Sequence, residues 1–299
     1  MTPYEAYTKA GSVAARVRET SKNLVRQGAL IIDICEELES SIRKLGAQPA
    51  FPCNVSQNSE AAHYTAGIGD GRKIEAGAIV KIDVGAHVEG YIADTATTVS
   101  LSHEFDRMTI VNKQLLEDAV KTIRGGVSIS VVANAVEPAA HRNGFKPISN
   151  LAGHELGNYI IHAGVSVPNV SEPVNESFKY DTAYAVEPFL VPHEADGSVV
   201  NGPGGNIYRL VSRKRTKNQG LDQIVEFIWN KFKSLPFSPR WLIQEFGERT
   251  VTNGMSELSK LKLVMQYPRL VESSGAMVSQ FEHTIYVSKE STRVTTAFP

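Results

Sequence analysis

Four acidic residues and one histidine, each set in an apolar or glycine-rich stretch, constrain most strongly how this chain folds. They stand in KIDVG, IADTAT, LAGHELG, YAVEPF and QFEHTI, and are Asp83, Asp94, His154, Glu187 and Glu282. A carboxylate in an apolar strand is rarely buried unless it is paired or bound to a metal. Carboxylate oxygens with one imidazole suit two divalent metals, which can activate a water molecule between them. The pattern predicts a fold that gathers these distant segments into one hydrolytic site.

Residues 76–101 carry the clearest hairpin pattern, two alternating segments separated by Glu89-Gly90. A two-residue turn there sets Asp83 opposite Ala96 and places Asp94 on the same face, so that the two carboxylates converge. Two exposed strand aspartates are the alternative, but Asp is depleted in strands and like charges repel. The opposite, apolar face is expected to carry Ile82, Val84 and Ile92.

The remaining pattern alternates helical and strand-rich regions. Residues 3 to about 45 predict two helices divided near Gly28 and ended by Gly46, and residues 105–145 predict further helix that Pro138 starts, kinks or ends. Residues 193–206 (HEADGSVVNGPGGN) have the composition of a boundary. Because Glu282 follows the helical stretch 207–266, that stretch is interpreted as an insertion into a domain formed by 1–206 and 267–299.

Composition narrows the class of protein. The 299 residues carry a formal net charge of −1, which gives no general attraction to nucleic acid or an anionic membrane, and no apolar run approaches the ~20 residues of a membrane helix. Cys35 and Cys53 are the two cysteines and form no CxxC motif, so a reducing, cytoplasmic location is expected. The polar N-terminus does not resemble a secretory signal.

Other chemical motifs are weaker. His63 and His162 are the remaining catalytic candidates, although neither is informative alone. There is no GxSxG nucleophile motif, and GIGDG (67–71) lacks the strand, Lys-Ser/Thr and helix of a phosphate loop. The basic run RKRTK (213–217) fits either a nucleic-acid or ribosome contact or a solvated loop, and the solvated loop is favoured.

The ordered motifs together carry a family resemblance. FPCNVSQN, AAHYT, KIDVGAHVEGYIADTATTV, NLAGHELGNYIIHAG, YAVEPF and SGAMVSQFEHTI span residues 51–285. In this order and spacing they resemble the type 2 methionine aminopeptidases, in the short form without a long N-terminal extension. The resemblance implies an α/β (α+β) pita-bread fold: a pseudo-symmetric antiparallel sheet with outer helices and a small helical, winged-helix-like insertion.

The resemblance also implies how the site works. The five residues above would bind two divalent ions (Co, Mn, Fe or Zn), with Asp94 and Glu282 bridging them and Glu187 acting as the general base. His63 and His162 would contact the substrate. The methionine pocket would be lined by Phe51, Ile161, Phe189 and Tyr267. The implied substrates are the N-termini of nascent polypeptides with small second residues, acted on by a monomer, and ribosome contact is left open.

Two departures from the family pattern and two rival functions remain. Pro188 follows Glu187 and lacks the N–H that strand pairing uses, and the stretch 193–206 is divergent. An Xaa-Pro dipeptidase or aminopeptidase of the same fold would use the same ligands, although the helical insertion and FEHTI favour methionine release. A non-catalytic homologue that binds RNA or protein is the other rival, and the presence of all five ligands argues against it.

Overall fold

The structure is a computed structural model that describes residues 1–298. The helices are α1 (Pro3–Ser21), α2 (Ile31–Lys44), α3 (Asp106–Thr122), α4 (Val131–Arg142), α5 (Gln219–Phe232), α6 (Ile243–Phe246) and α7 (Glu248–Lys260), with 3-10 turns η1 (His103–Phe105) and η2 (Pro239–Leu242). The strands are β1 (Gln48–Pro49), β2 (Asn54–Gln57), β3 (Glu60–Ala62), β4 (Ile79–Val88), β5 (Tyr91–Ser100), β6 (Phe145–Pro147), β7 (Ala152–Leu156), β8 (Ser166–Pro168), β9 (Thr182–Val186), β10 (Phe189–Pro192), β11 (Val199–Leu210), β12 (Val264–Glu272), β13 (Ser279–Gln280), β14 (His283–Val287) and β15 (Thr292–Val294).

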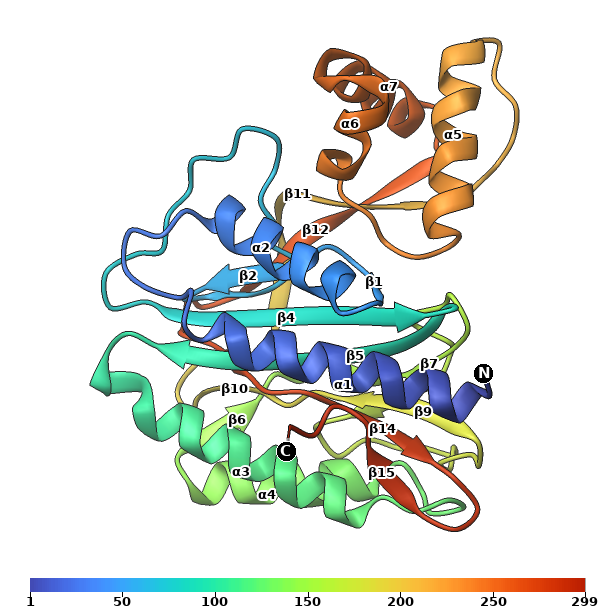
Figure 1. Cartoon of the computed structure of the whole chain (residues 1–299). Coiled ribbons are helices and arrows are strands. Elements are labelled where there is room, and N and C mark those ends of the chain that lie inside the picture. Colours follow the sequence, from blue (N-terminus) through green and yellow to red (C-terminus); the bar gives the residue numbers. More distant parts are fainter. Residues whose placement is uncertain (299) are drawn as a thin grey trace.

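The strands form antiparallel sheets that meet in the middle of the molecule, with helices outside them (Figure 1). One sheet contains β1, β4 and β2 with β5 beside β4, and another has the order β15-β14-β9-β7-β8. Two smaller sheets have the orders β13-β10-β6 and β11-β12-β3. Helix α1 lies across β4 and β5, and α3 and α4 pack together on the other half (Figure 1). This arrangement agrees with the expected α/β fold with outer helices.

The predicted hairpin is confirmed in its turn and its register. Glu89 and Gly90 have φ of 52° and 87°, the left-handed values that a tight two-residue hairpin turn requires. Asp83 lies opposite Ala96, and Asp94 lies opposite Gly85. The placement of Ile92 was wrong: it packs in a cluster with Phe51 and Leu156, on the face that carries Asp94. Side chains two residues apart share one face of a strand, so Ile92 cannot face away from Asp94.

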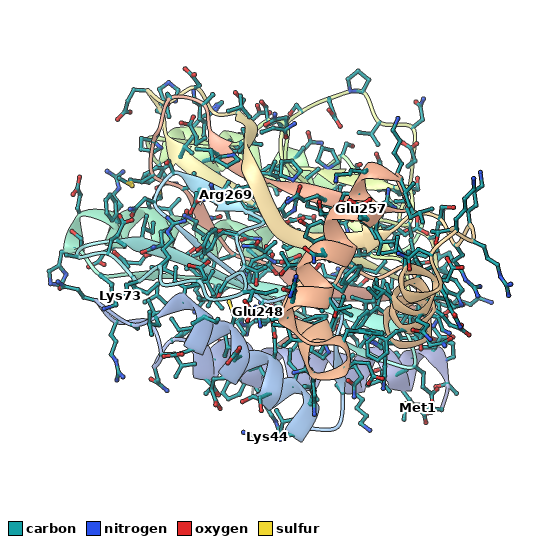
Figure 2. All side chains as sticks on the ribbon, turned by 90° about the horizontal axis from the view of Figure 1, so that it is seen from above. Met1, Lys44, Lys73, Glu248, Glu257 and Arg269 are labelled. Carbon is teal, nitrogen blue, oxygen red and sulfur yellow. The ribbon has the colours of Figure 1, made fainter. Side chains whose placement is uncertain are left out.

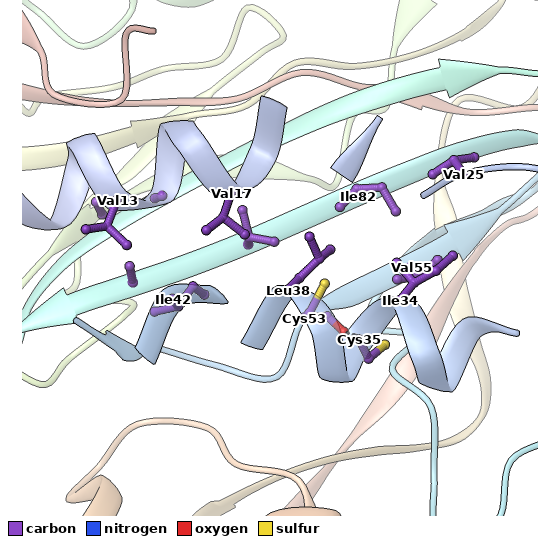
Figure 3. Packing of buried hydrophobic residues seen from close by; sticks show 14 of the residues in the cluster. Val13, Val17, Val25, Ile34, Cys35, Leu38, Ile42, Cys53, Val55 and Ile82 are labelled. Carbon is purple, nitrogen blue, oxygen red and sulfur yellow. Dashed lines mark hydrogen bonds between the residues drawn. The ribbon is translucent and has the colours of Figure 1, made fainter. Parts of the chain in front are cut away.

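The N-terminal helices cover the outer face of this hairpin. Helix α1 begins with a capping box, in which Thr2 and Glu5 each accept a bond from the other's backbone. Gly28 and Gly46 have φ of 80° and 82° and separate and end the two helices as predicted. Val13, Val17, Leu38 and Ile82 are among the side chains that fill the space between the helices and β4 (Figure 3). The buried Cys35 and Cys53 are free thiols in this layer.

Helices α3 and α4 form the corresponding layer on the other half of the molecule. The buried Asn112 side chain of α3 donates to the Pro188 and Ser279 carbonyls, at 3.1 and 3.0 Å, and so ties the helix to β10 and β13. Pro138 lies inside α4, and the helix neither begins nor ends at it. The buried side chains of Val132, Val136 and Ala140 hold α4 on the core on both sides of Pro138. Their packing outweighs the loss of the backbone hydrogen bond that proline cannot donate.

Residues 193–206 are not irregular throughout, as their composition indicated, because β11 begins at Val199 and pairs with β12 over most of its length. A domain boundary there stays a prediction. Glycine, proline and asparagine disfavour a strand, but the ladder tolerates them at the register shifts between Asn201 and Tyr208.

Between β11 and β12 lie the helices α5, α6 and α7. They close over their own apolar cluster, which includes Ile228, Phe237 and Leu258. Seen from above, α7 with Glu248 and Glu257 lies over the body of the molecule (Figure 2). We call residues 211–263 the helical lobe. Its status as a separate domain, with the boundaries 207–266, stays a prediction. None of the helices within residues 1–298 is long and apolar enough to cross a membrane.

Candidate active site

A cavity of about 310 Å³ opens where the sheets meet. Its wall includes all eleven site residues expected from the sequence: Phe51, His63, Asp83, Asp94, His154, Ile161, His162, Glu187, Phe189, Tyr267 and Glu282. Segments more than 200 residues apart along the chain therefore line one space.

The five predicted metal ligands come from five different places in the sheets. Asp83 lies on β4, Asp94 on β5 and His154 on β7. Glu187 follows the end of β9, and Glu282 lies between β13 and β14. His154 Nε2 is 3.6 Å from Glu187 Oε1 and 3.8 Å from Asp94 Oδ2. One ligand atom from each of Asp94, His154 and Glu282 lies within 4.8 Å of the others, a spacing that suits a shared cation.

The electrostatics of this cluster favour a bound cation. Burial raises the pKa of Asp83 to about 7, and burial with mutual repulsion raises the pKa values of Asp94, Glu187 and Glu282 well above their usual range. Burial lowers the pKa of His154 to about 3, so its imidazole is neutral, as a metal ligand must be.

Hydrogen bonding leaves much of the cluster unsatisfied. Asp83 Oδ1, Asp94 Oδ1 and both Glu282 carboxylate oxygens are buried without a hydrogen-bond partner among residues 1–298. Buried polar atoms without partners are costly, and clustered carboxylates with free lone pairs are what hard divalent ions take as ligands. The residues present therefore fit a bound divalent cation.

Threonine side chains hold Asp94 and Glu282 together where the sheets meet without a backbone ladder. The Thr284 hydroxyl donates to the Asp94 carbonyl at 2.7 Å and accepts from the Asp94 N–H at 2.7 Å. The Thr95 hydroxyl donates to the Glu282 carbonyl at 2.7 Å. The buried Arg18 guanidinium donates to that hydroxyl at 2.6 Å, so α1 supports the same junction. These contacts fix the spacing between Asp94 and Glu282.

Gly153 allows β7 to approach β9 closely enough to place His154. A Cβ at Gly153 would lie 2.2 Å from the Ala185 carbonyl oxygen, which is backbone and cannot move aside. We expect Gly153→Ala to lower the free energy of unfolding by about 2 kcal/mol and, by shifting His154, to reduce kcat/KM about 100-fold.

Urea denaturation and a peptidase assay check this expectation. Gly71→Ala is the control, because a Cβ there meets nothing within 4 Å. Equal stability and activity of the two variants would show that the close approach at Gly153 is not needed.

The two histidines outside the ligand cluster, His63 and His162, also line the cavity. His63 has φ of 66°, a left-handed conformation that is uncommon for a residue with a Cβ. Its Nδ1 lies 3.3 Å from the Pro268 carbonyl, which orients the ring, and burial lowers its pKa to about 4. The His162 ring contacts the His154 ring with centroids 4.3 Å apart. Both rings can therefore present a nitrogen to a molecule bound beside the ligand cluster.

The apolar part of the cavity contains the four expected pocket residues, and the Phe51 ring lies directly against Gly85, whose missing side chain makes room for it. Sequence reasoning missed Ile207 on β11 and Leu270 on β12, which line the same wall, because the strand at 199–210 was not foreseen. It also missed Gln280, whose Nε2 donates to Glu187 Oε2 at 3.3 Å, and Thr284. Alternation about Glu282 could have found both, since each is two residues from it.

The departure at Pro188 has a visible effect. Strand β9 ends at Val186 and β10 begins at Phe189, so Glu187 and Pro188 interrupt the strand. The Asn169 side chain donates to the Glu187 carbonyl at 3.0 Å, and Asn112 occupies the Pro188 carbonyl. These side chains, with the Phe281 N–H at 3.5 Å from the Pro188 carbonyl, take the place of a regular ladder, and the Glu187 carboxylate still lines the cavity.

Comparison with known proteins agrees with this geometry. The model of metallopeptidase family M24 matches residues 5–289. A methionine aminopeptidase of Saccharolobus solfataricus is 41% identical over 293 residues, covering 96% of this chain and 95% of its own. Among solved structures, a thermophilic Arx1 aligns with a TM-score of 0.82 at 17% identity, covering 99% of this chain and 91% of its own. A methionine aminopeptidase of Thermotoga maritima aligns with a TM-score of 0.71 at 21% identity, covering 100% and 98%. The chain therefore belongs to metallopeptidase family M24 and, within it, to the methionine aminopeptidases.

Proposed function

We propose that the cavity removes the N-terminal methionine of polypeptides with two divalent ions, held by Asp83, Asp94, His154, Glu187 and Glu282. The observation that carries this proposal is the cluster of buried carboxylates with unsatisfied oxygens around one neutral imidazole. Such a cluster is unfavourable as a bare structural feature and favourable around cations. Cobalt, manganese, iron and zinc all suit this donor set.

The remaining residues have separate tasks in hydrolysis. The bound ions would supply an activated water of lowered pKa. The Glu187 carboxylate, oriented by Gln280, accepts the water proton and passes it to the leaving amine. His162 donates a hydrogen bond to the scissile carbonyl oxygen as negative charge develops there, and His63 contacts the substrate amide.

The shape of the cavity supports methionine as the released residue. Phe51, Ile161, Phe189 and Tyr267 surround a space that suits an unbranched, polarisable side chain. We expect crowding beside the ligand cluster to favour small second residues. An Xaa-Pro peptidase would need room for a proline ring at that position.

Metal-stripped protein tests the proposal directly. We expect release of free methionine from Met-Ala-Ser when Co(II) or Mn(II) is added, and none when an Xaa-Pro peptide replaces it. Cleavage of the Xaa-Pro peptide alone would assign the chain to the rival activity. Folded protein that releases no methionine with any of the four metals would leave the non-catalytic, RNA- or protein-binding alternative.

The proposed partners and location follow from the substrate. Nascent polypeptides supply initiator methionine, so we place the activity in the cytoplasm, which the two free cysteines support. We propose a monomer, since one chain supplies the whole cavity wall described above. The proposal includes no nucleic-acid partner. Arg213 and Lys233 lie over the Trp229 ring, at 4.5 and 5.2 Å, which supports the solvated-loop interpretation of part of the RKRTK run.

A further inference from the structure

A second cavity of about 360 Å³ adjoins the mouth of the active-site cavity. The two share Ile161, His162 and Tyr267 as wall residues. The outer cavity therefore offers a path for the rest of a polypeptide whose first residue occupies the inner cavity. Recognition of the substrate residues that follow the first one rests on the proposed function.

The outer cavity has an apolar rim and a single formal charge. Ile160 and Met265 are large apolar side chains with exposed fractions of 48% and 36%. Arg209 is the one charged residue in the wall, and the wall has no acidic residue. Within residues 1–298, the side chain of Arg209 makes one hydrogen bond, a 3.8 Å contact from Nη2 to Met265 Sδ, and no ion pair. An exposed cation without a carboxylate partner is free to attract one from a ligand.

The strand register places this cation relative to the substrate. Ile207 and Arg209 are two residues apart on β11, and both line cavity walls that include Tyr267, so they lie on the same side of the strand. Ile207 lines the inner cavity and Arg209 the outer one. An extended substrate also repeats its side-chain direction every second residue, with a rise of about 3.3 Å per residue. A substrate that runs alongside β11 with its first side chain beside Ile207 directs its third side chain toward Arg209.

We propose that Arg209 makes this enzyme favour an acidic side chain at the third residue of its polypeptide substrate. Opposite charges attract across the exposed mouth, so the contact lowers KM and leaves kcat nearly unchanged. The fourth side chain points away from Arg209 and has little influence.

Amidated peptides test the proposal, since amidation leaves the side chain as the only carboxylate. We expect kcat/KM to fall by about threefold at each step from Met-Ala-Asp-Ala-NH2 to Met-Ala-Asn-Ala-NH2 to Met-Ala-Lys-Ala-NH2, the size of an exposed ion pair. The differences should shrink at high salt. Met-Ala-Ala-Asp-NH2 and Met-Ala-Ala-Lys-NH2 should differ little, which separates the register from general attraction.

Variants identify the residue responsible. Arg209→Gln should give similar kcat/KM values for the three peptides, and Arg209→Glu should reverse the order of these values. Arg16→Gln is the control, because Arg16 is exposed on α1 and its loss changes the net charge equally. Equal rates on the three peptides, or a preference that survives in Arg209→Gln, would overturn the inference alone. Absence of methionine release from every peptide, with any metal, would overturn it together with the proposed function.

Discussion

His154→Ala should abolish methionine release, with kcat/KM reduced by about 1000-fold or more. The imidazole is the one nitrogen donor in the ligand cluster, with Nε2 within 3.8 Å of two carboxylates. Its loss leaves the acids without a neutral partner that can share a cation. The peptidase assay with saturating Co(II) or Mn(II) measures the effect.

Thermal unfolding separates loss of metal binding from loss of fold. A ligand at 100 times its dissociation constant stabilises the native state by about 2.7 kcal/mol, so added metal should raise the Tm of the wild type. The Tm of His154→Ala should respond much less, while its metal-free Tm stays near that of the wild type. His193→Ala is the control, because His193 is exposed and lies outside the cavity. Full activity in His154→Ala would rule out the ligand assignment.

Glu39→Ala should give the largest loss of stability, about 3–5 kcal/mol, because it leaves a buried guanidinium without its counter-charge. Glu39 on α2 accepts from Arg240 Nη2 at 3.0 Å and from Trp241 Nε1 at 2.6 Å, both at the start of η2 in the helical lobe. It also accepts from the Cys53 N–H at 3.2 Å. The side chains of the ion pair are 2% and 5% exposed, so water cannot replace the lost partner.

Urea denaturation measures this effect against a matched variant of the same helix. Glu36→Ala removes an exposed carboxylate from α2 and should change the free energy of unfolding by about 0.5 kcal/mol or less. If Arg240→Ala costs as much and the double variant costs little more than either one, the two residues act as a pair. Similar losses in Glu39→Ala and Glu36→Ala would contradict the importance of this contact.

Local chemistry made much of the fold and the site predictable. The turn at Glu89-Gly90 set the register of β4 and β5, and the register set the face shared by Asp83 and Asp94. Acidic residues in apolar surroundings marked positions that come together in the cavity wall, because burial of a charge requires a partner. The ordered motifs then predicted the fold, which the family match and the solved relatives confirm.

The features that escaped prediction depend on contacts between distant segments. Strand β11 forms despite its Gly-Pro-Gly-Gly run because β12, over 50 residues later, supplies its partner. The Arg18–Thr95–Glu282 connection joins residues from three regions of the chain, so no local pattern announces it. The role proposed for Arg209 depends on the outer cavity, which is formed by distant segments.

The position of the two ends of the helical lobe affects which changes of sequence such a chain can accept. Leu210 and Val264 are direct partners in the β11–β12 ladder, so the intervening segment leaves and re-enters the sheet at one point. A change in the length or sequence of that segment alters only the loop that joins β11 and β12. The pairing of the two strands, which places Ile207 and Tyr267 in the cavity wall, is preserved. The catalytic body and its appendage can therefore diverge at different rates, provided that the substituted segment restores a partner for the buried Glu39.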